Sequence, residues 1–326
     1  MASESLRKAR PARPAAPATP LQPSKSPPVA LAASMRPAQA FAAIATTCLR
    51  QLATNAPGVL SGENAEFVHQ MRVALRRLRS AMRLFDAVLP PGFTARVTPE
   101  LRRLAQLLGA ARDWDVLAGE TLPRVLRAQP DKKPGATEKT LVTAIAPQRA
   151  ACAAAVRSAL RSRRYRALLQ DLSATVKSMR QDDAAEKRAR LRGFAARQLK
   201  RAENKIRVTP AELAGMSEAQ RHAFRIAAKR LRYAVEFFYS LFDAEAVRPY
   251  TARLEELQDV LGMLNDHAVA LALLDRLSAP PRALAAARKA LLAHNEMALQ
   301  EAARIHTRLR ASKRFWRARG KNAPGP

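Results

Sequence analysis

From residue 37 onward, apolar side chains recur at steps of three and four positions, which is the spacing of one face of an α-helix. Glycine is scarce, and the strict alternation of polar and apolar residues that marks strands is absent. The pattern therefore predicts an all-α fold. Its clearest part is a stripe along one helix that we expect to be buried, formed by Phe67, Met71, Leu75, Leu78, Met82, Phe85 and Leu89.

Proline, glycine and capping residues divide this helical region. Ser61 and Asn64 predict the start of the helix that carries the stripe, and Pro90-Pro91 predicts its end. About eight long helices with short connections should result, which favours antiparallel bundles. The other expected breaks lie at 55–58, 130–135, 209–210 and 280–281.

Residues 1–36 differ from the rest of the chain. They hold seven of the 22 prolines and few large apolar residues, so they predict a disordered basic arm that contributes nothing to the core. Composition alone leaves open whether this arm is functional or inert. Residues 319–326 are expected to fray.

The chain also repeats itself. A shift of 153 residues places 69–85 on 222–238, and eight of the 17 positions are then identical. The same shift, without a gap, places Asp113 on Asp266. Separated blocks in one register indicate a duplicated unit of roughly four helices. The predicted organisation is an arm at 1–36, repeats at 37–180 and 181–318, and a tail at 319–326.

Charge narrows the class of partner. Lysine and arginine total 57 against 27 aspartate and glutamate, and 44 of the basic residues are arginine. Guanidinium groups bind phosphate oxygens bidentately, so the expected partner is a phosphate polymer, a nucleic acid or an acidic membrane surface. Aromatic residues make up only 5%, which is poor for stacking on bases. No apolar run is long enough to span a membrane and the start lacks a secretory pattern, so a cytoplasmic protein without membrane insertion is expected.

Basic side chains form two rows at helical spacing, beside the apolar stripe. Their neighbours at i+3 and i+4 are again bases, which repel one another, so the rows favour an external anion over ion pairs within the helix. In the second row Glu236 stands where the first has Arg83, and shorter rows near the repeat ends could extend the same surface. The predicted binding positions are His69, Arg72, Arg76, Arg79 and Arg83, then His222, Arg225, Lys229 and Arg232, and near the repeat ends Arg161, Arg164, Arg310 and Lys313.

Arg77 and Arg230 lie off these rows and are interpreted as structural partners of carboxylates or as solvated groups. His69 and His222 begin equivalent rows, which favours a shared role such as donating a hydrogen bond to phosphate. Neither histidine implies catalysis, because no nucleophile has a recurring partner.

No catalytic residue, metal site or cofactor is predicted. Asp113 and Asp115 are interpreted as counter-charges for arginines, with a metal site as the less favoured alternative. Gly109 and Gly262 are expected to allow a close helix approach or a kink.

Together these motifs resemble the CHAD domain, an α-helical domain named for its histidines. The resemblance rests on His-x-x-Arg-x-x-x-Arg/Lys-Arg-Leu-Arg at 69–79 and 222–232, each followed by Leu-Gly-x-x-x-Asp, and it covers about residues 37–318. It implies two four-helix bundles related by a pseudo-twofold axis, with basic residues on a central surface. Members of that family bind inorganic polyphosphate and can associate with polyphosphate granules. The Glu-x-Glu-x-Lys signature of the triphosphate-tunnel domain that often accompanies it is absent, so triphosphate hydrolysis is not expected.

The sequence therefore predicts a non-enzymatic polyphosphate-binding protein, found at polyphosphate granules. Two alternatives stay open. The same charge could bind the backbone of nucleoid DNA or RNA. An enzyme of phosphate-polymer metabolism would need acidic metal ligands, for which Asp113 and Asp115 are the candidates. Oligomeric state has no signature in the sequence.

Overall fold

The computed structural model of the chain describes residues 21–62, 64–128, 134–181, 191–293 and 295–317. Within these ranges every regular element is helical, which confirms the all-α prediction, and no helix there is both long and apolar enough to cross a membrane. A π-helical turn, η2 (Leu117–Thr121), joins α3 to α4. The α-helices are α1 (Pro37–Ser61), α2 (Ala65–Leu84), α3 (Phe93–Val116), α4 (Leu122–Arg127), α5 (Pro134–Arg161), α6 (Arg163–Gln181), α7 (Leu191–Asn204), α8 (Pro210–Ala214), α9 (Glu218–Phe238), α10 (Ala244–Leu274), α11 (Pro281–Leu292) and α12 (Asn295–Ala311).

Helix α2 begins at the predicted capping residue. The Oδ1 of Asn64 accepts a hydrogen bond from the backbone N–H of Glu66 at 2.8 Å, which satisfies one of the free donors at the helix start. The predicted apolar stripe is buried from Phe67 to Phe85. Leu89 is only half-buried, because the chain has left the helix after Leu84.

The break expected at 55–58 is wrong, since α1 continues through Pro57 to Ser61. Asn55 is fully buried and its Nδ2 donates to the carbonyl oxygen of Gln51 at 2.7 Å, so it caps no new helix. Gly58 serves a close approach, because a Cβ there would lie 2.4 Å from ring carbons of Phe67. The helix ends instead at Gly62, whose φ of 76° is a left-handed conformation that glycine adopts readily.

The central helices of the first half recur in the second, whereas the flanking helices differ. Shifted by 153 residues, α2 falls within α9, and α3 falls within α10. The breaks predicted at 209–210 and 280–281 are confirmed, because α8 begins at Pro210 and α11 at Pro281. The long α5 corresponds to two shorter helices, α11 and α12.

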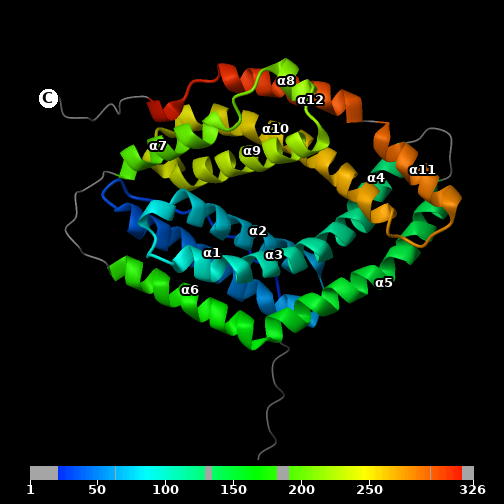
Figure 1. Cartoon of the computed structure of the whole chain (residues 1–326), viewed down its shortest axis with the longest axis horizontal. Coiled ribbons are helices and arrows are strands. Elements are labelled where there is room, and N and C mark those ends of the chain that lie inside the picture. The colour runs from blue at the N-terminus through cyan, green and yellow to red at the C-terminus, as the bar shows by residue number, and fades with distance from the viewer. Residues whose placement is uncertain (1–20, 63, 129–133, 182–190, 294, 318–326) are drawn as a thin grey trace, which may run out of the picture.

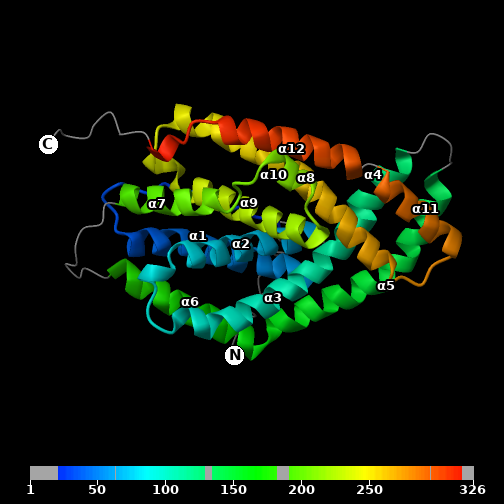
Figure 2. The ribbon, with the colours of Figure 1, turned by 45° about the horizontal axis from the view of Figure 1, so that its top comes forward.

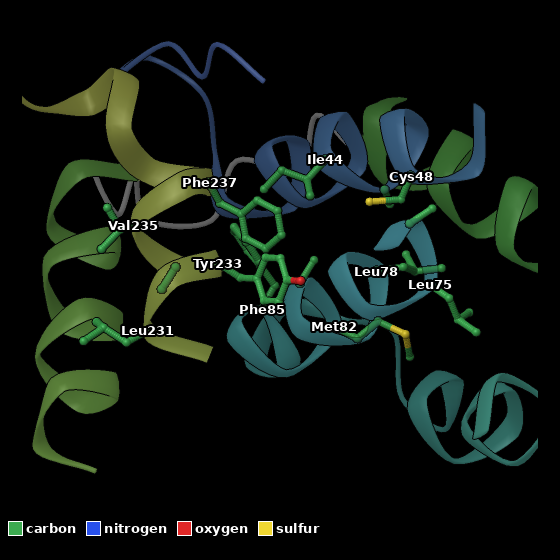
Figure 3. Close-up of a cluster of buried hydrophobic side chains, with 14 of the residues drawn as sticks. Ile44, Cys48, Leu75, Leu78, Met82, Phe85, Leu231, Tyr233, Val235 and Phe237 are labelled. Atoms are coloured by element: carbon green, nitrogen blue, oxygen red, sulfur yellow. The ribbon is translucent and has the colours of Figure 1, made fainter. Parts of the chain in front are cut away.

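Both halves share one hydrophobic core. Four phenylalanines meet at their junction, and Phe194 and Phe238 are the residues 153 positions after Phe41 and Phe85. The ring of Phe85 lies 5.2 Å from Phe194, 5.6 Å from Phe238 and 5.9 Å from Phe41, measured between centroids. Figure 3 shows Phe85 beside Tyr233 and Phe237 of α9. The halves are thus joined through packed side chains as well as through the chain.

A second, smaller core joins the halves at the other end of the molecule. There Trp114 and Leu122, near the end of α3 and in α4, belong to the same buried cluster as Leu274 and Leu291 of α10 and α11. In Figures 1 and 2, α2 and α3 lie on one side and α9 and α10 on the other, with α4 and α11 meeting at the right-hand end. The apolar faces of α2 and α9 belong to the larger core.

Part of the predicted arm is packed on the bundle. Residues 1–20 lie outside the described residues, as does the tail from 318. Residues 21–36 have no long helix, but Leu31 is buried and its backbone N–H donates to the Oγ of Ser240 at 2.8 Å. The backbone N–H of Ser24 donates to Oδ1 of Asn55 at 3.0 Å. The expectation that the arm contributes nothing to the core is therefore wrong for this segment.

Candidate functional site

The two predicted basic rows lie on α2 and α9, which pack against each other where the halves meet. The Nε of Arg76 donates to the hydroxyl of Tyr233 at 2.5 Å. The Cζ atoms of Arg76 and Arg232 lie 5.8 and 5.2 Å from the centroid of the same tyrosine ring. Figure 3 shows Tyr233 projecting from α9 toward α2. One buried ring thus positions an arginine from each row through cation–π contact.

Between the rows lies a cavity of about 230 Å³, which we call the central pocket. An Nη2 of Arg72 lies 3.6 Å from Oδ1 of Asp113 on α3. Asp266, the residue equivalent to Asp113 in the second half, lines the same cavity. Both halves therefore contribute charged groups to it. Its charged and titratable lining includes His69, Arg72, Arg76, Arg112, Asp113, Glu120, Lys229 and Asp266.

A neighbouring cavity of about 350 Å³ extends the central pocket. It shares Arg76, Lys229 and Asp266 with it, and its further charged lining consists of Arg124, Arg232, Glu255 and Asp259. Gly262 also lines this cavity, and a Cβ built there would meet no atom within 4 Å. Gly109 has equally open space beside it. The close helix approach predicted for these two glycines is therefore wrong, and at Gly262 the missing side chain leaves the cavity open.

Burial and neighbouring positive charges disfavour the charged forms of the basic side chains in the central pocket. Burial lowers the pKa of Lys229 from 10.5 to about 7, and the charges of Arg225 and Arg76 add to the effect. The pKa of Arg72 is lowered by burial and then by Arg76. Burial and then the charge of Arg112 lower the pKa of His69 below its usual range, so His69 is neutral at pH 7. An anion in the pocket would oppose each of these shifts, because it would stabilise the charged form.

The carboxylates weaken this excess of positive charge without removing it. Burial raises the pKa of Asp113, opposed by Arg72, and the charge of Asp266 raises it further. Asp115 lies two residues away and accepts a hydrogen bond from Nε of Arg149 at 2.8 Å. Asp113 and Asp115 therefore serve different arginines, as the counter-charge interpretation predicted. No group of three or more His, Cys, Asp or Glu side chains within the described ranges has the geometry of a metal site.

The equivalent histidines lie in different surroundings. His69 is half-buried in the central pocket, whereas His222 is exposed and lines a separate cavity of about 420 Å³ between α9, α10 and α12. Arg225 also lines this cavity of about 420 Å³, yet it lies near enough to Arg72 and Arg76 for their charges to lower its pKa. The structure thus brings Arg225 to the edge of the central pocket and leaves His222 outside it.

Arg79 and Arg83, further along α2, line another cavity of about 310 Å³ together with Arg102 of α3. Arg77 is buried and its Nη2 lies 3.0 Å from Oε1 of Glu236, so its interpretation as a structural partner is confirmed. Arg230 has no carboxylate partner within the described residues, and its positive charge lowers the pKa of both Arg79 and Arg83. Of the two interpretations given for Arg230, the ion pair with a carboxylate is therefore wrong, and the side chain is only partly solvated.

The rows near the repeat ends do not reach the central pocket. Arg310 donates from Nη1 to the carbonyl oxygen of Val208 at 2.7 Å, and Arg164 pairs with Glu100 at 2.5 Å. Arg161 and Lys313 are exposed. Figure 1 shows the junction of α5 with α6 and the end of α12 on opposite outer sides of the molecule. The expectation that Arg161, Arg164, Arg310 and Lys313 extend the same surface is therefore wrong.

Several lining residues were not predicted from the sequence. Tyr233, Arg112 and Arg124 lie in or beside the central pocket, but the equivalent positions in the other repeat do not carry the same residue types. The repeat register, which singled out the rows, therefore gave no signal for them. Asp266 did have such a signal, as the counterpart of Asp113.

Comparison with known proteins identifies the fold. A family model described as CHAD domain matches residues 43–275. The crystal structure of the CHAD domain from the plant Ricinus communis superposes with a TM-score of 0.76 and 33% identity, over 90% of this chain and 98% of that one. The structure of PptA from Streptomyces chartreusis has the same fold, with a TM-score of 0.58 and 20% identity over 84% of this chain and 97% of that one.

Two uncharacterized proteins, one from each of two Mycobacterium tuberculosis strains, are 35% identical over 169 residues. The match covers 51% of this chain and 33% of each relative. The aligned part thus spans about a third of the length of the curated relatives it matches.

Proposed function

Because this chain belongs to the CHAD domain family, we propose that it binds inorganic polyphosphate in the central pocket and the cavity beside it. The observation that carries the proposal is the convergence of cations from both halves, Arg72 and Arg76 with Lys229 and Arg232, on adjoining cavities. Lowered pKa values at Arg72 and Lys229 mean that these cations are held at a cost in the free protein. A polyanion would offset that cost.

Shape and composition favour a polymer without bases. Duplex nucleic acid is read in its grooves or along a broad backbone surface, whereas these cations line cavities of about 230 and 350 Å³. Tyr233, the aromatic residue beside them, is buried and is occupied by two arginines, so it offers no free face for base stacking. Arginine-rich cavities without stacking platforms suit a slim chain of phosphates.

We also propose that the protein acts by binding alone and associates with polyphosphate granules. Asp113 is engaged by Arg72, and Asp115 by Arg149, which leaves neither as an obvious metal ligand. Phosphate release measured with magnesium and long-chain polyphosphate tests this point. Release above that of a heat-denatured sample would show a hydrolase instead.

The binding proposal is tested by competition at physiological salt. A labelled long-chain polyphosphate is bound to the protein and displaced with unlabelled polyphosphate or with duplex DNA of equal phosphate concentration. Polyphosphate should displace the label at concentrations at least tenfold lower than DNA. Equal displacement by both polymers would favour a nucleic-acid backbone protein, and no saturable binding of polyphosphate would overturn the proposal.

A further inference from the structure

Four arginines from α2, α3 and α9 lie close together, and none of them has a carboxylate partner among the described residues. Arg79 and Arg83 of α2 and Arg102 of α3 line one cavity, and Arg230 of α9 lies close enough for its charge to lower the pKa of Arg79 and Arg83. We call these four the arginine cluster. No ion pair or hydrogen bond links any of their guanidinium groups to another described residue. Asp86 lines the same cavity, but its Oδ1 accepts from the hydroxyl of Thr94 at 3.3 Å.

The repeat allows the arginine cluster to be compared with the equivalent positions of the other repeat. The positions equivalent to the arginine cluster at the step of 153 residues are Arg232, Glu236, Glu255 and Arg77. There the charges cancel, with Arg77 held 3.0 Å from Glu236, and Glu255 lining a cavity together with Arg232. The arginine cluster, with three members from the first half and Arg230 from the second, therefore holds four positive charges where the equivalent positions hold two positive and two negative charges.

The arginine cluster holds like charges close together without a counter-charge, and an anion in the cavity would stabilise it. Burial lowers the pKa of Arg79 and of Arg83, and the neighbouring arginines lower both further. The Nε of Arg230 is buried and makes no hydrogen bond within the described part of the chain. The second half shows that a carboxylate at the position of Arg83 can neutralise this geometry, so an external anion can do the same for the first half.

We propose that the arginine cluster is a second anion site, which takes phosphate groups of a polyphosphate chain as that chain leaves the central pocket. The inference rests on the proposed function. From Arg76 in the central pocket to Arg83 the helix rises about 10 Å, a distance that a few phosphate units span. Because the second half has no such cluster at the equivalent positions, the bound polymer continues along the first half only.

The variant Arg83→Glu/Arg102→Glu tests this directly, because it gives the first half the charge pattern of the second. The pattern already exists in this fold, so the variant should fold normally, as checked by circular dichroism. Its matched control is Arg180→Glu/Arg201→Glu, which changes net charge equally at two exposed sites on α6 and α7. Neutralising four charges should lower the slope of log affinity against log salt by about 3, and weaken long-chain polyphosphate binding at least tenfold beyond the control.

Inorganic tripolyphosphate separates the inference from the function. Wild-type protein should bind it saturably, and Arg83→Glu/Arg102→Glu should bind it several-fold more weakly than the control variant does. If the cluster variant and its control bind both ligands equally, the cluster is not an anion site and the proposed function stands. If wild-type protein binds tripolyphosphate at the cluster but not long-chain polyphosphate, the proposed function fails and the anion site stands. Should Arg83→Glu/Arg102→Glu misfold, Arg102→Gln with the control Arg103→Gln gives the same comparison at an exposed position.

Discussion

Replacing Lys229 by arginine should abolish a proton uptake that accompanies polyphosphate binding. In the free protein the pKa of Lys229 is about 7, because the side chain is buried among Arg225, Arg76 and Arg72. A bound polyanion supplies the missing counter-charge and should return this pKa toward its ordinary value. Arginine stays charged throughout, and the equivalent position of the first half already holds an arginine, Arg76.

The size of the effect follows from the pKa. At pH 8 a group with a pKa of about 7 is roughly one-tenth protonated, so wild-type protein should take up about 0.9 proton when it binds polyphosphate. The uptake should fall to about 0.5 at pH 7 and about 0.1 at pH 6. His69, whose pKa is also lowered, should add uptake only at the acid end of this range. Binding should therefore weaken nearly tenfold per pH unit above pH 8 in wild-type protein, and much less in Lys229→Arg.

Isothermal titration calorimetry at pH 8 measures this uptake. The slope of the observed binding enthalpy against the ionisation enthalpy of the buffer gives the number of protons taken up. Wild-type protein should give a slope near 0.9 and Lys229→Arg a slope near zero. Equal slopes for the two proteins would refute both the buried lysine and its contact with the polymer.

The same lysine governs the stability of the free protein. The unfolded chain holds the proton of Lys229 up to a pH of about 10.5, whereas the folded protein releases it near 7. The unfolded state therefore binds more protons within this window, and the free energy of unfolding should rise with pH across it. Lys229→Gln removes the titrating group and should reduce this rise, as followed by urea denaturation at several pH values.

Three further outcomes are expected. Arg72→Gln/Arg76→Gln should weaken polyphosphate binding ten- to a hundredfold by fluorescence anisotropy, because two charged contacts are lost, and equal losses in Arg163→Gln/Arg180→Gln would mean that only total charge matters. Deleting residues 1–20 should leave the free energy of unfolding unchanged, whereas deleting 1–36 should lower it by about 2–4 kcal/mol through loss of the buried Leu31 and its hydrogen bonds, and identical melting of the two truncations would contradict this. Glu236→Gln should destabilise the protein by about 3 kcal/mol in urea because it leaves Arg77 buried without a counter-charge, and a cost no larger than that of the exposed Glu255→Gln would disprove the role of this pair.

The periodicity of the sequence predicted the features that depend on a single helix. The stripe from Phe67 to Phe85 and the basic row beside it follow from 3.6 residues per turn, and the capping side chain of Asn64 set the start of α2. The repeat register then identified α9 as the second basic helix. These features need no knowledge of what lies opposite them.

What depends on the neighbouring helix could not be predicted in the same way. The spacing of Arg310 with its neighbours shows that they share a face, but not that this face meets the carbonyl of Val208. The residue types at 55–58 are typical of a turn. Only the packing of Phe67 against Gly58 explains why α1 continues through these residues. Arg102 and Arg230 fall outside any row, because they reach the arginine cluster from other helices than α2.

The phenylalanine junction has a consequence for how such a molecule can be assembled. A single repeat would leave Phe41 and Phe85 uncovered, and a second copy of itself would cover them in the way that Phe194 and Phe238 do. Two identical subunits paired about a twofold axis must, however, carry the same residue at both equivalent positions. Linking the subunits covalently removes that constraint while keeping the aromatic contact. In such a fused pair one side can hold an arginine at position 83 while its counterpart holds the glutamate at 236.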